Sequence, residues 1–214
     1  MKKISIIAAS LVSVALLCSC GSSSNKTAGT ESTAENALSA DAALPAIHKY
    51  GIKSGIVTFE NSGFGLTFKQ VLYFDDYGTK EAVETYDPDG TLKETNLCDG
   101  KNRYILIHKD KAAFPQGECF RGVAYKFDWN EVAQAGNEYK PTKLANVSIA
   151  GKDCESFSLD VSGNKTVYAG WNNVCFLIDT ESMGAKVLNK ALTIEENASV
   201  PGDKLKVPGD YKMN

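Results

Sequence analysis

Histidine is scarce in this sequence, and the short motifs that carry much of enzymatic chemistry are missing from it. Only two histidines occur among its 214 residues. His48 ends a polar segment and His108 ends an expected strand, and at such positions surface or turn roles are commoner than catalysis. The sequence has no Gly-x-Ser-x-Gly, no Walker loop and no His-Glu-x-x-His. We therefore expect that this protein is not an enzyme.

The residue spacing of a metal site is also missing. The cysteines beyond the N-terminal region include no Cys-x-x-Cys pair, which structural zinc sites usually contain. Residues 87–90 read Asp-Pro-Asp-Gly, like the start of a calcium loop, but Cys98 stands where that loop has its bidentate acid. A tight turn explains the four residues better. The sequence predicts no metal ion and no cofactor.

An excess of positive charge is absent. Without residues 1–19, which hold two lysines and no acid, the chain has 21 basic and 26 acidic residues. A mildly acidic chain of this kind argues against nucleic acid as a partner and against a polybasic patch for lipid headgroups.

The one long apolar run lies at the N-terminus. Lys2 and Lys3 precede a nearly unbroken apolar stretch, residues 4–17, which has the length of the hydrophobic region of a secretory signal and is too short to cross a membrane. No later segment is apolar enough to span a bilayer. The sequence therefore predicts an exported protein.

The residues after this run resemble the bacterial lipobox. Leu17 is apolar, Cys18 and Ser19 are small, and Cys20 provides the thiol to which a diacylglyceryl group is attached. Cleavage without lipidation, or cleavage before Cys18 after bulky residues, fits the pattern less well. We expect a lipid on Cys20 that anchors the chain to a bacterial membrane, facing the periplasm or the outer surface. Gly21 is not the Asp that retains some lipoproteins at the inner membrane, so the leaflet stays open.

Three regions follow from composition. Residues 1–19 are the expected signal peptide. Residues 20–47 are a lipidated tether, since the segment is rich in Ser, Thr, Ala, Asn, Gly and Glu and has too few large apolar residues to fold. Residues 48–214 have the size of one domain with one core.

The domain has the residue pattern of strands. Phe157, Leu159 and Val161 alternate with polar residues, a period of two. We expect further strands at 52–60, 66–75, 80–86, 103–108, 143–149, 166–169, 174–180 and 185–195, most of them about ten residues apart with turns between them. Asp128 and Glu131 form a capping box for one short helix, residues 129–135. The predicted fold class is mainly β (α+β), a strongly curved antiparallel sheet with one short helix packed on it.

Four cysteines, Cys98, Cys119, Cys154 and Cys175, belong to this domain. An even number in an exported chain favours two disulfides, although three pairings are open. Residues 162–165 form an expected hairpin turn between the last two cysteines, and residues 109–111 form another between the first two. We therefore favour the pairings 98–119 and 154–175.

Five segments carry a resemblance to known proteins. They are residues 50–60 (YGIKSGIVTFE), 73–78 (YFDDYG), 149–154 (IAGKDC), 194–198 (IEENA) and 207–211 (VPGDY). Together they resemble an uncharacterised family of exported bacterial proteins related to the LolA/LolB-like lipoprotein carriers. The resemblance implies an unclosed half-barrel whose hollow holds acyl chains beneath a helical lid. The lid expected here is shorter, so the protein's own side chains could fill the hollow. The family pattern has no catalytic residues.

Aromatic side chains are the candidates for a ligand site. They fall on or beside the expected strands and the helix: Phe59, Phe68, Tyr73, Tyr104, Trp129, Phe157, Trp171 and Phe176. Packing in the core explains most of them, and a remaining hollow would be lined by the same set. The leading hypothesis is a membrane-anchored, non-enzymatic protein that binds a lipid or acyl chain in the concave face of the sheet. The alternative is a module with a filled core that binds another envelope protein. A hydrolase ranks last.

Overall fold

The computed structural model describes residues 48–119, 141–161, 164–182 and 184–214, all of which belong to one compact unit, Ala43–Asn214. The expected signal peptide, Cys20, the tether, the helix at 129–135 and Trp129 lie outside the described residues, so these predictions stay predictions. Within the described ranges, no helix is long and apolar enough to cross a membrane.

Nearly all of the described regular structure is strand, apart from one short 3-10 turn. The elements are β1 (Gly55–Gly63), β2 (Leu66–Asp75), η1 (Asp76–Gly78), β3 (Lys80–Tyr86), β4 (Leu92–Cys98), β5 (Asn102–Ile107), β6 (Ala112–Glu118), β7 (Thr142–Lys143), β8 (Val147–Ile149), β9 (Lys152–Val161), β10 (Asn164–Trp171), β11 (Val174–Ser182), β12 (Ala185–Glu196) and β13 (Lys212–Met213).

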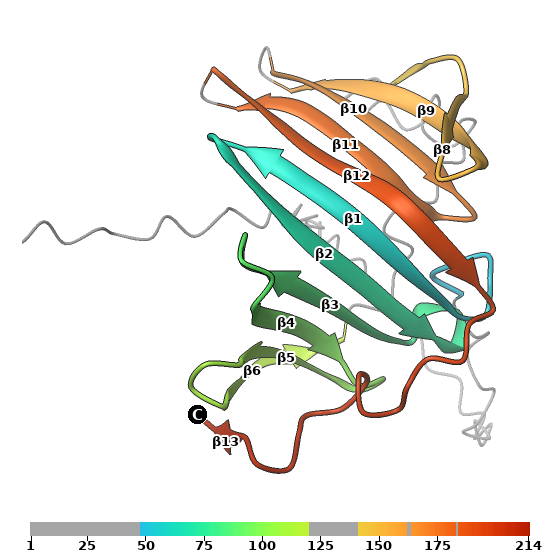
Figure 1. Ribbon diagram of the computed structural model, residues 1–214. Coiled ribbons are helices and arrows are strands. Elements are labelled where there is room, and N and C mark those ends of the chain that lie inside the picture. Colours follow the sequence, from blue (N-terminus) through green and yellow to red (C-terminus); the bar gives the residue numbers. More distant parts are fainter. Residues whose placement is uncertain (1–47, 120–140, 162–163, 183) are drawn as a thin grey trace, which may run out of the picture. The chain divides into compact units, whose positions relative to one another are not determined.

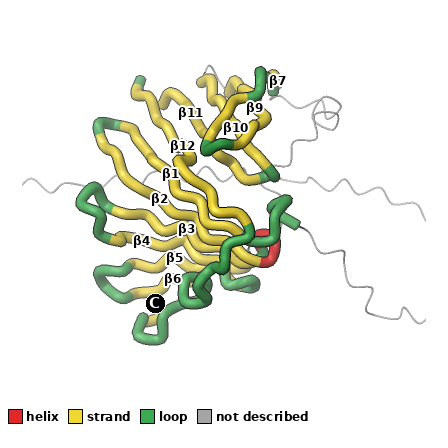
Figure 2. The backbone as a smooth tube through the Cα atoms, turned by 45° about the vertical axis from the view of Figure 1, so that its right-hand side comes forward, coloured by secondary structure: helices red, strands yellow, loops and turns green. Residues whose placement is uncertain are grey.

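These strands form one sheet that is not closed (Figure 1). Its order is β13-β6-β5-β4-β3-β2-β1-β12-β11-β10-β9-β7, and β8 pairs with β9. All these pairs are antiparallel except β13 with β6. Most neighbours in the sheet follow each other along the chain, as in a meander, but β1 pairs with β12 and so joins the two halves of the sheet (Figure 2). The predicted class, a mainly β, unclosed antiparallel sheet, is confirmed.

Three strands had no counterpart in the sequence analysis: β4, β6 and the two-residue β13. β4 has the sequence LKETNLC and lacks a clear alternation of apolar and polar residues, and β6 contains Pro115 and Gly117. β4 pairs along its length with both β3 and β5, so backbone hydrogen bonds to two neighbours compensate for its weak pattern. β6 lies near the edge of the sheet and pairs with β13 only at Ala112 and Ala113. Pro115 and Gly117 lie beyond this pairing, and an edge position of this kind tolerates both residue types.

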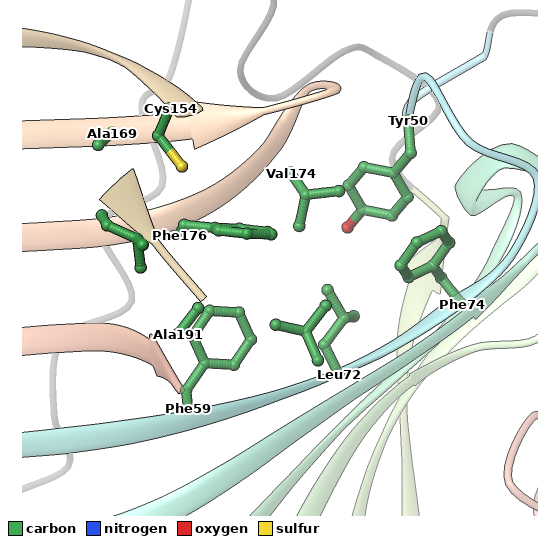
Figure 3. Close-up of a cluster of buried hydrophobic side chains, with 11 residues drawn as sticks. Tyr50, Phe59, Leu72, Phe74, Cys154, Ala169, Val174, Phe176 and Ala191 are labelled. Atoms are coloured by element: carbon green, nitrogen blue, oxygen red, sulfur yellow. The ribbon is translucent and has the colours of Figure 1, made fainter. Parts of the chain in front are cut away.

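The larger core lies between the two halves of the sheet (Figure 3). Phe59 of β1 and Leu72 and Phe74 of β2 pack in one cluster with Val174 and Phe176 of β11. Phe74 and Phe176 are fully buried. Tyr50, Val57, Ile149, Cys154, Ala169 and Ala191 complete this cluster. Side chains from both halves of the sheet thus occupy the space between β1–β2 and β11.

A second core forms on the opposite face of β2–β6. Because side chains alternate along a strand, Tyr73 points away from Leu72 and Phe74. Tyr73 and Tyr104 pack against a cluster of Ala82, Leu97, Leu106, Ala113 and Leu205. Leu205 belongs to the C-terminal segment, residues 197–214, whose Val200, Val207 and Tyr211 also pack there. The last residues of the chain therefore bury a face of the sheet that would otherwise be exposed.

The cysteines give one confirmed pairing and one correction. Cys98 and Cys119 form a disulfide, with their Cα atoms 5.6 Å apart. Cys154 and Cys175 are free thiols, and the predicted 154–175 bond is wrong in this structure. Cys154 is on β9 and Cys175 is on β11, and β10 pairs with both strands and so lies between them. Across two strand spacings, about 10 Å, a disulfide cannot form without moving the backbone.

Candidate functional site

A pocket of about 350 Å³ opens on β9, β10 and β11. Asp153, Glu155 and Phe157 reach it from alternate positions of β9 and therefore share one face of that strand. The other lining residues come from β10, from β11 and from the turn that joins them: Tyr168, Ala169, Gly170, Trp171, Asn172, Asn173 and Cys175. Ala169 also belongs to the larger core, so the pocket lies directly beside that core.

Three aromatic residues, Phe157, Tyr168 and Trp171, are part of the lining. Phe157 and Tyr168 are directly paired across β9 and β10, and their rings stack with centroids 5.2 Å apart. The Trp171 ring lies 6.3 Å from that of Phe176 and packs against the core. The ammonium of Lys152 is 4.7 Å from the centroid of Trp171 and forms an ion pair with Glu196. These contacts hold the rings in place before any ligand binds.

The hairpin turn at Asn172 and Asn173 also lines the pocket. Both residues have a positive φ, 48° and 60°, a conformation that asparagine tolerates better than most residues and that suits a two-residue hairpin. The carbonyl of Asn172 accepts a hydrogen bond from the backbone N–H of Gly51 at 2.8 Å. A Cβ on Gly170 would lie 2.9 Å from the carbonyl oxygen of Val174, so glycine is required for this close approach of β10 and β11.

Two carboxylates bring negative charge to the pocket. Asp153 and Glu155 are both exposed. Oδ2 of Asp153 accepts a hydrogen bond from Nδ2 of Asn146 at 2.9 Å. Glu155 has no ion-pair partner among the described residues. None of the described lining residues is basic.

The thiol of Cys175 is not activated. Burial, with a smaller contribution from the neighbouring Cys154, raises its pKa to about 12. The thiol donates a hydrogen bond to the carbonyl of Leu177. Burial also raises the pKa of Cys154. Both thiols are therefore protonated at neutral pH, and a thiolate is the form that attacks substrates. Burial likewise raises the pKa of the Tyr168 hydroxyl.

The predicted ligand-lining residues separate into distinct sets. Phe157 and Trp171 line the pocket. Phe59 and Phe176 are buried in the larger core, and Tyr73 and Tyr104 pack on the other face of the sheet. Phe68 is half-buried on β2, outside both cores. Trp129 lies outside the described residues.

The sequence analysis did not single out Asp153, Glu155, Tyr168 or the Asn172–Asn173 turn. Alternation along β9 could have placed Asp153 and Glu155 beside Phe157, since the three residues are two apart. The partner strand and its register were needed to place Tyr168 against Phe157.

A second polar cluster lies under the C-terminal segment. Nζ of Lys204 donates to the buried Glu84 at 2.6 Å, and the hydroxyl of Tyr86 donates to the same carboxylate at 2.6 Å. His108 lies 2.7 Å from the hydroxyls of both Thr95 and Tyr211. Burial, followed by the Glu84 hydrogen bond, raises the pKa of Tyr86 well above its usual range, and burial lowers the pKa of His108. These groups satisfy one another and attach the C-terminal segment to the sheet.

Among the described residues, no group of three or more His, Cys, Asp or Glu side chains is arranged to hold a metal ion.

Comparisons with known proteins identify the fold. No known protein family matches the sequence, and no curated protein is similar enough to count as a relative. An uncharacterized conserved protein from Thermus thermophilus has a similar structure, with a TM-score of 0.52, 8% identity, and coverage of 79% of this chain and 94% of that one. MucB is similar too, with a TM-score of 0.52, 12% identity, and coverage of 78% of this chain and 60% of that one.

MucB also matches in the structure of its Pseudomonas aeruginosa complex with MucA, with a TM-score of 0.52, 11% identity, and coverage of 78% of this chain and 60% of that one. The chain thus spans about 60% of the length of MucB. At identities this low, these similarities establish a shared fold and no shared activity.

Proposed function

We propose that this protein is a non-enzymatic lipoprotein of the bacterial cell envelope that binds a hydrophobic ligand, such as an acyl chain, in the pocket on β9–β11. The pocket is the observation that carries the proposal. Its volume of about 350 Å³ is at the lower end of the range of small-molecule sites, roughly 300–1,000 Å³. Apolar rings beside a few polar groups are the usual lining of such sites.

The envelope location is supported by three independent features. The apolar run and the lipobox predict export and a lipid on Cys20. The Cys98–Cys119 disulfide is typical of proteins in an oxidising compartment. The sequence also resembles exported relatives of the LolA/LolB-like carriers, and the open antiparallel sheet agrees with the architecture that this resemblance implies.

The proposed ligand site differs from a carrier's central hollow. Phe59, Leu72 and Phe176 meet in the larger core, so the protein's own side chains occupy that space. The pocket lies beside the core, where Trp171 contacts both. It is therefore suited to one small ligand or to part of an acyl chain.

Binding without catalysis is supported by the chemistry of the lining. Cys175 has a raised pKa, so it is a poor nucleophile. Neither of the two histidines in the sequence is among the described lining residues, so no imidazole base is placed beside the thiol.

Ligand binding is tested with the mature chain, from residue 20, carrying Cys20→Ser, exported behind a cleavable signal peptide that directs no lipidation. Lipids extracted from the purified protein are identified by mass spectrometry, and uptake of a fluorescent fatty acid is titrated. Tyr168→Ala removes one of the stacked rings, and we expect it to weaken uptake about tenfold, a loss of the size that a lost aromatic contact causes. Tyr104→Ala, a half-buried tyrosine on the other face, is the matched control and should bind normally. Empty wild-type protein that takes up no probe contradicts the proposal.

A second candidate function is a module that binds another envelope protein. The filled larger core favours it, because a sheet without a central hollow can serve as a rigid scaffold. A protein of similar fold, MucB, has been solved in complex with MucA. Crosslinking in cells that carry the lipidated chain, followed by mass spectrometry, tests this candidate. Recovery of one stoichiometric partner by wild type and by Tyr168→Ala alike would support it.

A further inference from the structure

The lining of the β9–β11 pocket has a charge that is unusual for a site that would take fatty acids. Asp153 and Glu155 are two residues apart on β9, so both carboxylates lie on the side of the strand that carries Phe157. The nearest basic residue in sequence, Lys152, is already paired with Glu196. No basic side chain is among the described lining residues, so the charged groups of the described lining are the two acids.

The aromatic residues of the lining also favour a cation. The face of an aromatic ring attracts ammonium groups, most strongly for tryptophan. One face of Trp171 already has such a contact, with the Lys152 ammonium 4.7 Å from the ring centroid. The half-buried Tyr168 adds further ring surface on β10. Carboxylates beside aromatic rings are the combination that recognises alkylammonium groups.

From these two observations we propose that the pocket selects amphiphiles with a positively charged head, an alkylammonium, over neutral or anionic amphiphiles of the same chain length. The inference rests on the proposed function, because it specifies the class of ligand for the same pocket. The apolar tail contacts Tyr168 and Trp171, and the ammonium lies near Asp153 and Glu155. An anionic head would meet two like charges and lose its hydration without gaining a partner.

The test uses the mature chain with Cys20→Ser and three probes with the same ten-carbon tail, each below its micelle concentration. They are decyltrimethylammonium, decyl maltoside and decyl sulfate, titrated by isothermal calorimetry. Since the sequence has only two tryptophans, Trp129→Phe leaves Trp171 as the sole indole, and its emission provides a second readout at the pocket. We expect the ammonium probe to bind at least about tenfold more tightly than the maltoside, and the sulfate to bind most weakly.

Two charge variants separate the pocket from the net charge of the protein. Asp153→Asn with Glu155→Gln should reduce the preference for the ammonium probe to less than about threefold, while binding of the maltoside is retained. Asp110→Asn with Glu118→Gln removes two exposed acids elsewhere, by the same change in net charge, and should leave the preference intact.

The outcomes distinguish the two proposals. Equal affinity for the three probes overturns the charge selectivity and leaves the ligand site standing. Absence of binding by all three probes overturns both. A preference that the Asp110 and Glu118 control abolishes as fully as the pocket variant also overturns the selectivity, because it would then reflect the net charge of the protein.

Discussion

The side-chain oxygen of Tyr211 lies 2.7 Å from Nδ1 of His108, although 103 residues separate them in the sequence. The two rings also meet edge to face, with centroids 5.8 Å apart. The hydroxyl of Thr95 lies 2.7 Å from Nε2, on the other side of the same imidazole. A neutral imidazole suits this arrangement, since one ring nitrogen accepts and the other donates. His108 thus links strands β4 and β5 to the end of the chain.

This arrangement predicts a loss of stability at mildly acidic pH. Burial lowers the pKa of His108 below its ordinary value of 6.5, so the unfolded chain takes up a proton at a higher pH than the folded protein does. The contribution of His108 to stability is therefore complete above pH 6.5, the ordinary pKa. It is lost as the pH falls from 6.5 toward the lower pKa of the folded protein. Urea unfolding between pH 8 and pH 5 measures this, with His108→Gln as the comparison. The variant should show a weaker dependence on pH, and an unchanged dependence would contradict the assignment.

The Glu84–Lys204 pair predicts an asymmetry between single and double variants. The Glu84 side chain is 5% exposed and that of Lys204 is 30% exposed. Lys204→Met should destabilise the protein by about 2 kcal/mol, because it leaves a buried carboxylate without its cation; partial solvent access keeps the cost below that of a fully buried pair. Adding Glu84→Gln should recover much of the loss. Chemical denaturation measures both variants. A double variant no more stable than Lys204→Met would show that the buried charge is not the cause.

The cysteines predict a definite thiol count. In the mature chain with Cys20→Ser, unfolding without reductant should expose two reactive thiols, Cys154 and Cys175, since Cys98 and Cys119 are bonded. In the folded protein both should react slowly, because burial raises their pKa values. A thiol reagent with and without denaturant provides the measurement. A count of zero free thiols after unfolding would show that Cys154 and Cys175 form a disulfide.

Removing the disulfide should be costly. Cys98 and Cys119 are separated by 21 residues in the sequence, and closing a loop of that size stabilises a fold by about 3 kcal/mol in the chain-entropy account. The double variant Cys98→Ala/Cys119→Ala should therefore unfold at clearly lower urea concentration than wild type. Cys175→Ala, which removes a free thiol, is the comparison and should have the smaller effect.

Gly170, which lines the pocket, and Gly202, which does not, form a matched pair for testing the close approach of β10 and β11. A Cβ on Gly170 would approach the Val174 carbonyl oxygen to 2.9 Å, whereas a Cβ on Gly202 would meet nothing within 4 Å. Gly170→Ala should destabilise the protein by about 2 kcal/mol, because a backbone atom must move to admit the methyl group. Gly202→Ala should change stability by less than about 0.5 kcal/mol. Thermal unfolding of the two variants compares them, and equal effects would argue against the close β10–β11 approach.

The local residue pattern predicted much of the sheet, but it did not predict the features that depend on which strands pair with each other. The alternation at Phe157, Leu159 and Val161 and the turn residues at 87–90 are readable because each reflects contacts within a few residues. β4 and β6 were missed because their stability comes from neighbouring strands more than from their own sequence. The 154–175 pairing failed for a related reason. Distance along the chain does not show that a complete strand, β10, lies between the two cysteines.

In the candidate site, too, the sequence identified residue types, and the tertiary structure decided where they lie. Aromatic residues on strands were identified from the sequence, and Phe157 and Trp171 do line the pocket. Whether an aromatic ring faces a core, the opposite face or an open pocket depends on strand order and bulges. In the β10–β11 pairing, Ala169 pairs with Leu177 and Gly170 pairs with Cys175, so Phe176 is an extra residue on β11. No single-strand pattern contains that information.

By itself, the sequence determined the β class and the positions of most strands, and it predicts an export signal at residues 1–19 and lipidation at Cys20. These depend on composition, on short motifs and on a period of two, which are all local properties of a chain. Only the tertiary structure decided that the C-terminal segment covers a second core, that Cys154 and Cys175 stay apart, and that a pocket with two acids and three aromatic rings opens on β9–β11. Those features depend on which distant segments pair and in what register, and that is set by the burial of the sheet as a whole.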